Sequence, residues 1–139
     1  MPRPRRPRGP GYARVVTPPA LRRLVVKTTS GADRPEACNQ AFTVAAAAVA
    51  AGAEVSLWLT GEAAWLGVPG RSEDILLEHA APLHDLLSVV LAEGQVTVCT
   101  QCAVRRGITA ADLIPGVRIA GAAVFVEEAL APGAQALVY

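Results

Sequence analysis

Aromatic residues, long hydrophobic runs and cysteines are all scarce in this sequence, and each of these scarcities excludes some classes of protein. Phe, Tyr and Trp together make up 4% of the 139 residues, so a core must be built mainly from Ala, Val, Leu and Ile. The longest apolar run, 41–53, is interrupted by Thr43 and falls short of the roughly 20 residues that a membrane-spanning helix needs. We therefore expect a single domain, large enough for its own core, with no membrane partner.

The chain has three cysteines and no stretch of basic residues followed by an apolar segment, which would mark a secretory signal. Thiols without such a signal are typical of the reducing cytoplasm, so we expect a cytoplasmic protein without a disulfide framework. A zinc site at Cys99 and Cys102 would need two more ligands, and Cys38, His79 and His84 form no second close pair. A Ser-His-Asp set and a phosphate-binding Gly-rich loop are also missing. We expect no metal and no cofactor.

Positive charge is concentrated in residues 1–20, which hold six prolines, no acidic residue, and five arginines: Arg3, Arg5, Arg6, Arg8 and Arg14. Proline at this density prevents regular structure, so we predict a disordered extension over 1–20 and a domain over 21–139. The alternatives are a basic arm for nucleic acid or acidic lipid, and a true start near Val15 or Val16. The whole chain carries +1, so residues 21–139 carry −4, which argues against nucleic acid as the main partner.

Hydrophobic patterning predicts strands and helices in alternation. Short β-branched runs bounded by turn residues predict strands at 24–26, 54–59, 96–98, 117–120 and 136–139. Apolar residues at helical spacing predict helices at 34–51, 83–91 and 124–130. Strands that alternate with helices over short connections form a parallel sheet, because parallel neighbours need crossovers. We expect an α/β fold: a three-layer α/β/α sandwich with a mainly parallel sheet of about five strands.

Local patterns predict how individual helices begin and which side of them faces solvent. Asp33 and Glu36 have the spacing of a capping box at the start of the first helix, and Thr109 and Asp112 repeat that spacing before a short turn. The last helix is expected to place both Glu127 and Glu128 on its solvent side.

The most informative stretch for function begins with the apolar run 96–98, which predicts a strand buried on both faces. Cys99 follows at its carboxyl end, and Cys102 comes three residues later, where the chain turns into a short helix that Gly107 should end. A cysteine at a helix start meets backbone N–H groups and the positive end of the helix dipole, and both favour thiolate over thiol. The alternative is that one or both cysteines are core packing, since cysteine is often buried.

Polar and glycine-containing turns follow several of the predicted strands. In open parallel sheets, ligands bind beyond the carboxyl ends of the strands. We therefore expect four segments to meet at that end of the sheet: 28–31, 60–62, 99–102 and Gly121.

The same turns carry a family resemblance, together with the pattern that closes the chain. The matching segments are Thr29-Ser30-Gly31, Leu59-Thr60-Gly61-Glu62, Val98-Cys99-x-x-Cys102-x-x-Arg105-Arg106-Gly107-Ile108 and Asp112-Leu113-Ile114-x-Gly116-Val117-x-Ile119. In this order and spacing, residues 24–139 resemble the DsrE family of small sulfur-relay proteins, with the DsrE/DsrF-like α/β fold. The extension 1–20 is not part of the pattern.

The resemblance implies a role for the cysteine that ends the third strand. In family members that carry sulfur, this position holds the persulfide, and here it is Cys99. Some members lack the second cysteine, so Cys102 is a resolving thiol, a second acceptor or packing. Arg105 and Arg106 either add positive potential near the thiol or only solvate their helix. The resemblance also implies a homo-oligomer, a trimer or hexamer, or a complex with sister subunits.

Three functions remain open from the sequence. The first is sulfur transfer, in which Cys99 accepts sulfane sulfur from a donor protein and passes it to an acceptor thiol, supported by Thr29, Ser30, Gly31, Thr60, Gly61, Glu62, Arg105 and Arg106. The second is a thiol–disulfide redox protein that uses Cys99 and Cys102 as a reversible pair. The third is a non-catalytic oligomeric scaffold that has kept the fold. Whether the chain turns over as an enzyme stays open from the sequence, and the candidate activity is that of a sulfurtransferase or persulfide carrier.

Overall fold

The computed structural model describes residues 20–139. The predictions about residues 1–19, including the disordered extension and a start near Val15 or Val16, lie outside the described residues and stay predictions. Among residues 20–139, no helix is both long enough and apolar enough to cross a membrane.

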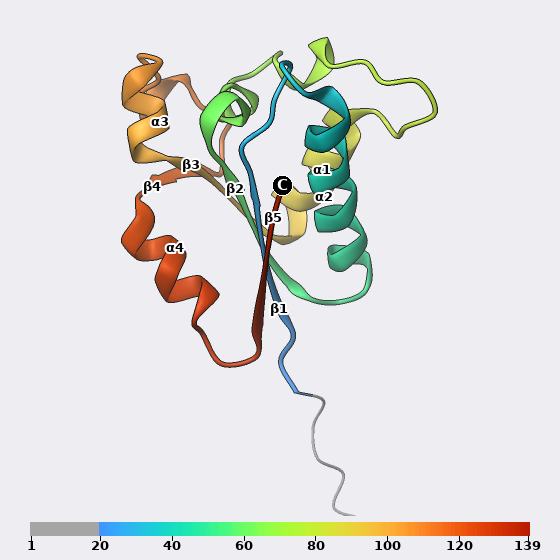
Figure 1. The fold of residues 1–139 in the computed structure, drawn as a ribbon, viewed down its shortest axis with the longest axis vertical. Coiled ribbons are helices and arrows are strands. Elements are labelled where there is room, and N and C mark those ends of the chain that lie inside the picture. The colour runs from blue at the N-terminus through green and yellow to red at the C-terminus, as the bar shows by residue number, and fades with distance from the viewer. Residues whose placement is uncertain (1–19) are drawn as a thin grey trace, which may run out of the picture.

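Within residues 20–139, five strands form one sheet in which every neighbouring pair is parallel (Figure 1). Their order across the sheet is β4-β3-β2-β1-β5, so β2 is central and β4 and β5 are the edges. The strand bounds are β1 Arg23–Thr28, β2 Glu54–Leu59, β3 Gln95–Cys99, β4 Val117–Ala120 and β5 Ala134–Val138. The predicted α/β class and five-stranded parallel sheet are confirmed.

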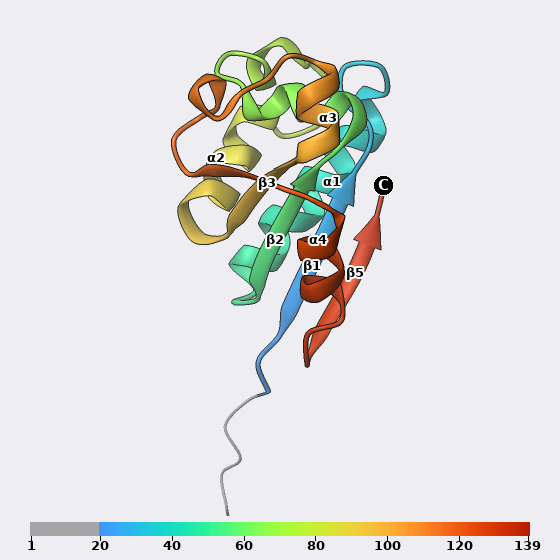
Figure 2. The same ribbon diagram turned by 90° about the vertical axis from the view of Figure 1, so that its left-hand side faces the viewer.

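Helices cover both faces of this sheet, which confirms the three layers. Helices α1 (Pro35–Ala50) and α2 (Leu83–Glu93) pack against one face. Helix α4 (Ala122–Ala129) lies on the other face, where the chain crosses from edge strand β4 to edge strand β5 (Figure 2). The short helix α3 (Thr100–Arg105) follows β3 directly, and a 3₁₀ helix (Gly61–Gly67) follows β2.

The core lies between the sheet and the pair α1 and α2. Alternate strand residues point to that side, and they are buried with apolar residues of the two helices in one cluster that includes Val26, Leu57, Leu59, Val96, Val98, Phe42 and Leu87. The intervening residues, such as Trp58 and Thr97, are buried on the opposite side of the sheet. Two buried faces explain why the three inner strands, β1 to β3, are mostly apolar. The edge strands β4 and β5 contain no buried residue.

The predicted capping box at the first helix is wrong. Helix α1 begins at Pro35, its N-cap is Arg34, and no side chain caps it. The Asp33 carboxylate instead accepts a hydrogen bond of 2.8 Å from the N–H of Gly31, so it closes the preceding turn. Asp side chains serve such turns as readily as helix caps, and residue spacing does not distinguish the two. The capping box of Thr109 and Asp112 is confirmed.

The prediction that Glu127 and Glu128 both face solvent is wrong for Glu128. The Glu128 carboxylate accepts hydrogen bonds from Ser56 Oγ (2.6 Å) and Trp58 Nε1 (2.7 Å) on β2, and it pairs with Arg118 on β4. The Glu128 carboxylate therefore points toward the sheet, where polar groups bind it, while Glu127 is exposed.

Candidate functional site

Cys99 is the last residue of β3 and the N-cap of α3, and its side chain is half-buried. Partial burial alone would raise its pKa. The N–H of Cys102, the Cys102 thiol, the N–H of Gln101 and the charge of Lys27 outweigh it, so the pKa of Cys99 lies below the ordinary value of 9.0. These N–H groups act without completing a side-chain cap hydrogen bond of standard geometry. The environment favours the thiolate, which is the reactive form of cysteine.

Cys102 is the third residue of α3 and is buried, with 8% of its surface exposed. Its sulfur accepts a hydrogen bond from the backbone N–H of Gly61, with a nitrogen–sulfur distance of 3.1 Å. Because the Cys102 thiol also lowers the pKa of Cys99, the two side chains are close enough to interact. The pair therefore consists of one accessible sulfur, on Cys99, and one enclosed sulfur, on Cys102. N–H groups of α3 act on the first, and the second is bonded to the segment that follows β2.

Arg106, the C-cap of α3, links this short helix to the segment that follows β2. Its guanidinium donates to the Glu62 carboxylate at 2.7 Å and to the carbonyl oxygen of Cys102 at 3.2 Å. Only 17% of the Arg106 side chain is exposed. Arg105, the preceding residue, is exposed and makes no ion pair or side-chain hydrogen bond within residues 20–139. Of the two arginines named from the sequence, only Arg106 is bonded to the site.

The turns after β1 and β2 form the frame beside the thiol pair. Thr60 Oγ1 donates to the carbonyl of Thr28 at 2.9 Å, and Thr29 Oγ1 donates to the carbonyl of Tyr139 at 3.1 Å. A Cβ on Gly31 would lie 2.7 Å from the carbonyl oxygen of Glu62, so these two turns touch. Ser30 is buried, and its hydroxyl has no hydrogen-bond partner among the described residues.

The segments expected at the carboxyl end of the sheet are thus adjacent, with Gly61 and Glu62 in contact with the residues around Cys102. Gly121 lies beside Thr100 on α3, where its added Cβ would be 3.8 Å from Thr100 Oγ1. Thr29 and Ser30 bond to other parts of the frame and not to either cysteine.

Lys27 is a charged neighbour of Cys99 that the sequence analysis missed. It lies on β1 in register with Trp58 of β2, which is in register with Thr97 of β3, so all three side chains point to the α4 face. Its amine lies 5.2 Å from the centre of the Phe125 ring. The signal in the sequence was a lysine inside an otherwise apolar strand, but the charge could be assigned to Cys99 only once the strand order was known.

Cys38 is the third cysteine of the chain and is buried away from this site. It lies in the first turn of α1 with no exposed surface, and burial together with the charge of Asp33 raises its pKa to about 12. A thiol that stays protonated and enclosed contributes packing and no sulfur chemistry.

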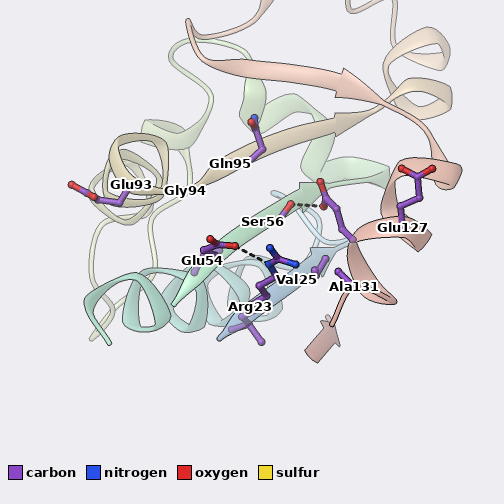
Figure 3. Close-up of a pocket in the computed structure, with 12 residues that line it drawn as sticks. Arg23, Val25, Glu54, Ser56, Glu93, Gly94, Gln95, Glu127 and Ala131 are labelled. Carbon is purple, nitrogen blue, oxygen red and sulfur yellow. Dashed lines mark hydrogen bonds and ion pairs between the residues drawn. The ribbon is translucent and has the colours of Figure 1, made fainter. Parts of the chain in front are cut away.

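One hollow of the molecule lies away from the cysteines. It is a pocket of about 450 Å³ at the amino ends of β1 and β2, beside α4, with Val25, Ser56, Gly94 and Ala131 among its lining residues (Figure 3). None of the residues lining it is a cysteine. The thiol pair therefore lies at the opposite end of the strands, outside this pocket.

Comparison with known proteins places the chain in a family. The family model described as the DsrE/DsrF-like family matches residues 22–138, whereas no curated protein matches.

Two solved structures have a similar fold. The YchN protein from E. coli has a TM-score of 0.70 at 20% identity, covering 86% of this chain and 99% of that one. MTH1491 from Methanobacterium thermoautotrophicum, whose function is described as unknown, has a TM-score of 0.56 at 10% identity with the same coverage of both chains. At these identities the likeness concerns the fold alone. The family match, which spans nearly all of the described residues, shows that this chain belongs to the DsrE/DsrF-like family.

Proposed function

We propose that the protein carries sulfane sulfur as a persulfide on Cys99 and passes it to a partner thiol. The observation that carries this proposal is the position of Cys99, a half-exposed thiol at the start of α3 with a pKa below its ordinary value. A carrier needs a nucleophilic sulfur that another protein can reach, and Cys99 combines both properties. Membership of the DsrE/DsrF-like family supports a sulfur-relay role.

The transfer needs two exchange steps. The Cys99 thiolate attacks the outer sulfur of a donor persulfide; a sulfur–sulfur bond to Cys99 forms as the bond to the donor sulfur breaks, and the donor leaves as a thiolate. An acceptor thiolate then attacks the outer sulfur of the Cys99 persulfide, and Cys99 leaves as a thiolate. The N–H groups of Cys102 and Gln101 that favour the thiolate remain in place for both steps. The start of α3 is held in place by hydrogen bonds that involve Arg106, Glu62 and Gly61. These residues take no part in the exchange of sulfur.

The test loads the full-length Cys102→Ser protein, in which Cys99 has no neighbouring thiol, with a persulfide donor and determines its mass. Transfer predicts a gain of about 32 Da for one sulfur atom, mapped to the peptide of Cys99. Adding Cys99→Ser should abolish this gain, whereas adding Cys38→Ala, which removes an enclosed thiol, should retain it. Full uptake by Cys99→Ser would contradict the assignment of Cys99.

A reversible Cys99–Cys102 disulfide is the second candidate, favoured by the position of Cys99 at the N-cap of α3 and of Cys102 in its first turn. A mild oxidant should then remove about 2 Da from the reduced protein without any sulfur donor. If neither treatment changes the mass, the chain is a scaffold of the same fold.

We further propose that the protein works as a homo-oligomer, a trimer or hexamer, alongside donor and acceptor proteins. The support is a group of exposed apolar residues on α4 and on the α4 side of β5, named here the α4–β5 surface, that consists of Val126, Leu130 and Val138. Their exposed fractions run from 49% for Val126 to 79% for Leu130. Apolar patches of this kind commonly mark protein–protein contacts.

A further inference from the structure

The two cysteines of the site differ in which molecules can reach them. Cys99 is half-exposed, whereas Cys102 is buried under the segment that follows β2 and holds the N–H of Gly61 at 3.1 Å. A bulky donor or acceptor protein therefore has access to Cys99 and not to Cys102. The sulfur that Cys102 can reach is that of Cys99, because Cys99 is the N-cap of α3 and Cys102 lies in its first turn.

We propose that Cys102 attacks the persulfide on Cys99 and releases its outer sulfur as sulfide, so that the protein reduces sulfane sulfur as well as carrying it. This inference rests on the proposed function, because it starts from the persulfide on Cys99. It adds a product, hydrogen sulfide, and a fixed role for the second cysteine.

The step balances without any added oxidant. The Cys102 sulfur attacks the inner sulfur, that of Cys99; the Cys102–Cys99 bond forms and the bond between Cys99 and the outer sulfur breaks. The outer sulfur departs with the electron pair of that bond and takes the proton of the Cys102 thiol, leaving as HS⁻ from an anionic persulfide. The outer sulfur is thereby reduced, and the Cys102 sulfur is oxidised to the disulfide level.

The geometry supports attack within the chain. Cys99 is the N-cap of α3 and Cys102 is its third residue. A side chain at the N-cap lies beside the backbone N–H groups of the second and third residues, so a small approach of the two sulfurs brings them into the range of a disulfide. The hydrogen bond from Gly61 fixes the position of the Cys102 sulfur, and the bond from Arg106 to the Cys102 carbonyl holds the same turn of α3. The attacking sulfur is thus positioned before the donor arrives.

The resting state is restored by a dithiol reductant. Such a reductant attacks the Cys99 sulfur of the disulfide, because that sulfur is the accessible one. Cys102 is then the leaving group, and its sulfur again accepts the hydrogen bond from the N–H of Gly61. Each cycle consumes one sulfane sulfur and one dithiol and yields one sulfide and one disulfide of the reductant.

The test follows a labelled sulfur atom. Full-length Cys38→Ala protein is reduced, mixed anaerobically with glutathione persulfide whose outer sulfur is ³⁴S, and desalted at once. We expect the protein to lose about 2 Da through an internal Cys99–Cys102 disulfide and to release about one equivalent of labelled sulfide. With Cys102→Ser in the same background, the labelled sulfur should stay on Cys99, and sulfide release should fall by about tenfold or more.

The outcomes separate the two proposals. A labelled adduct that persists on Cys99 while Cys102 is present, without sulfide, overturns the inference and leaves the relay intact. A loss of about 2 Da without labelled sulfide also overturns it, because the disulfide then has another origin. If the Cys102→Ser variant takes up no label, the relay itself fails. Cys102→Ala provides a second variant should serine disturb the buried position, and circular dichroism checks the fold of each.

Discussion

Three cysteines of one chain occupy three environments, and the environment decides what each thiol does. Cys99 is half-exposed with backbone N–H groups directed at it, Cys102 is enclosed but bonded to Gly61, and Cys38 is fully buried. The reactivity of a thiol follows its thiolate fraction, so these differences are measurable.

The first prediction concerns the pH dependence of thiol labelling. Partial burial raises the pKa of Cys99. The N–H groups of Cys102 and Gln101, the Cys102 thiol and the charge of Lys27 lower it by more, so the pKa lies below 9.0. Because the thiolate appears as pH rises through the pKa, labelling of Cys99 by iodoacetamide should reach half its maximal rate below pH 9.0. Cys38, with a pKa of about 12, should stay unlabelled in the folded protein. Peptide mapping across a pH series checks this, and equal labelling of both thiols would contradict it.

The second prediction compares two adjacent arginines. Arg106→Gln removes the ion pair with Glu62 and the bond to the Cys102 carbonyl, and should lower the free energy of unfolding by about 1–2 kcal/mol. Arg105→Gln is the matched control and should change it by less than about 0.5 kcal/mol. Urea unfolding measures both. Similar losses from the two substitutions would show that Arg106 does not fasten α3.

These arginines also show the limit of the sequence at this scale. Both follow Cys102 at helical spacing, and the sequence named both without distinguishing their roles. The difference arises because Glu62, from the segment after β2, lies on only one side of α3. Cys99 could be singled out from its place at a strand end, whereas Lys27 was found only from the order of the strands.

At the scale of elements, the tight contact between the turns after β1 and β2 depends on glycine. Gly61 has φ of +53°, and a Cβ there would lie 2.7 Å from the carbonyl oxygen of Thr29. Backbone atoms cannot give way as a flexible side chain does, so this position has no room for alanine.

The third prediction follows from that contact. Gly61→Ala should lower the free energy of unfolding by about 2 kcal/mol or more, because strain in the left-handed region adds to the clash. Gly70→Ala is the control: its φ is +84° but nothing lies within 4 Å of an added Cβ, so we expect a cost of about 1 kcal/mol. Thermal and urea unfolding compare the two, and equal costs would exclude a clash at Gly61.

The fourth prediction concerns the attachment of α4 to the sheet. Partial burial raises the pKa of Glu128, but hydrogen bonds from Ser56 and Trp58 and the pairing with Arg118 outweigh it and lower the pKa below 4.5. A carboxyl with a lowered pKa in the folded state contributes stability above its unfolded pKa. That contribution is lost as pH falls from about 4.5 through the lower, folded value.

Glu128→Gln should therefore cost about 1–2 kcal/mol at pH 7, since solvent partly screens Arg118. The difference between the variant and the unaltered protein should shrink as pH falls below 4.5. Unfolding by urea at both ends of this range tests the expectation. A constant difference would mean that the charge of Glu128 is not what holds α4. Glu127→Gln, at the exposed neighbour, is the control.

For the whole molecule, the question is what covers the α4–β5 surface. Helix α4 has no fully buried residue, and among the described residues β5 is an edge strand paired only with β1. Unpaired strand edges and exposed apolar helices are both suited to contact with another chain.

The fifth prediction is that assembly depends on this surface. We expect the full-length protein to have the mass of a trimer or hexamer by light scattering, and the double substitution Leu130→Glu and Val138→Glu to reduce it to the monomer. Leu76→Glu, which changes an exposed leucine outside this surface, should leave the assembly intact. A monomeric unaltered protein would overturn the proposed oligomer.

The sequence by itself determined the α/β class, the parallel sheet and the place of Cys99 at the end of β3, because these depend on local periodicity and on the few residues around a turn. Tertiary structure alone decided the bond from Gly61 to Cys102, the choice of Arg106 over Arg105, and the inward position of Glu128. Each of those contacts joins residues far apart in the chain. Spacing along a sequence carries no information about which distant groups the order of strands brings together.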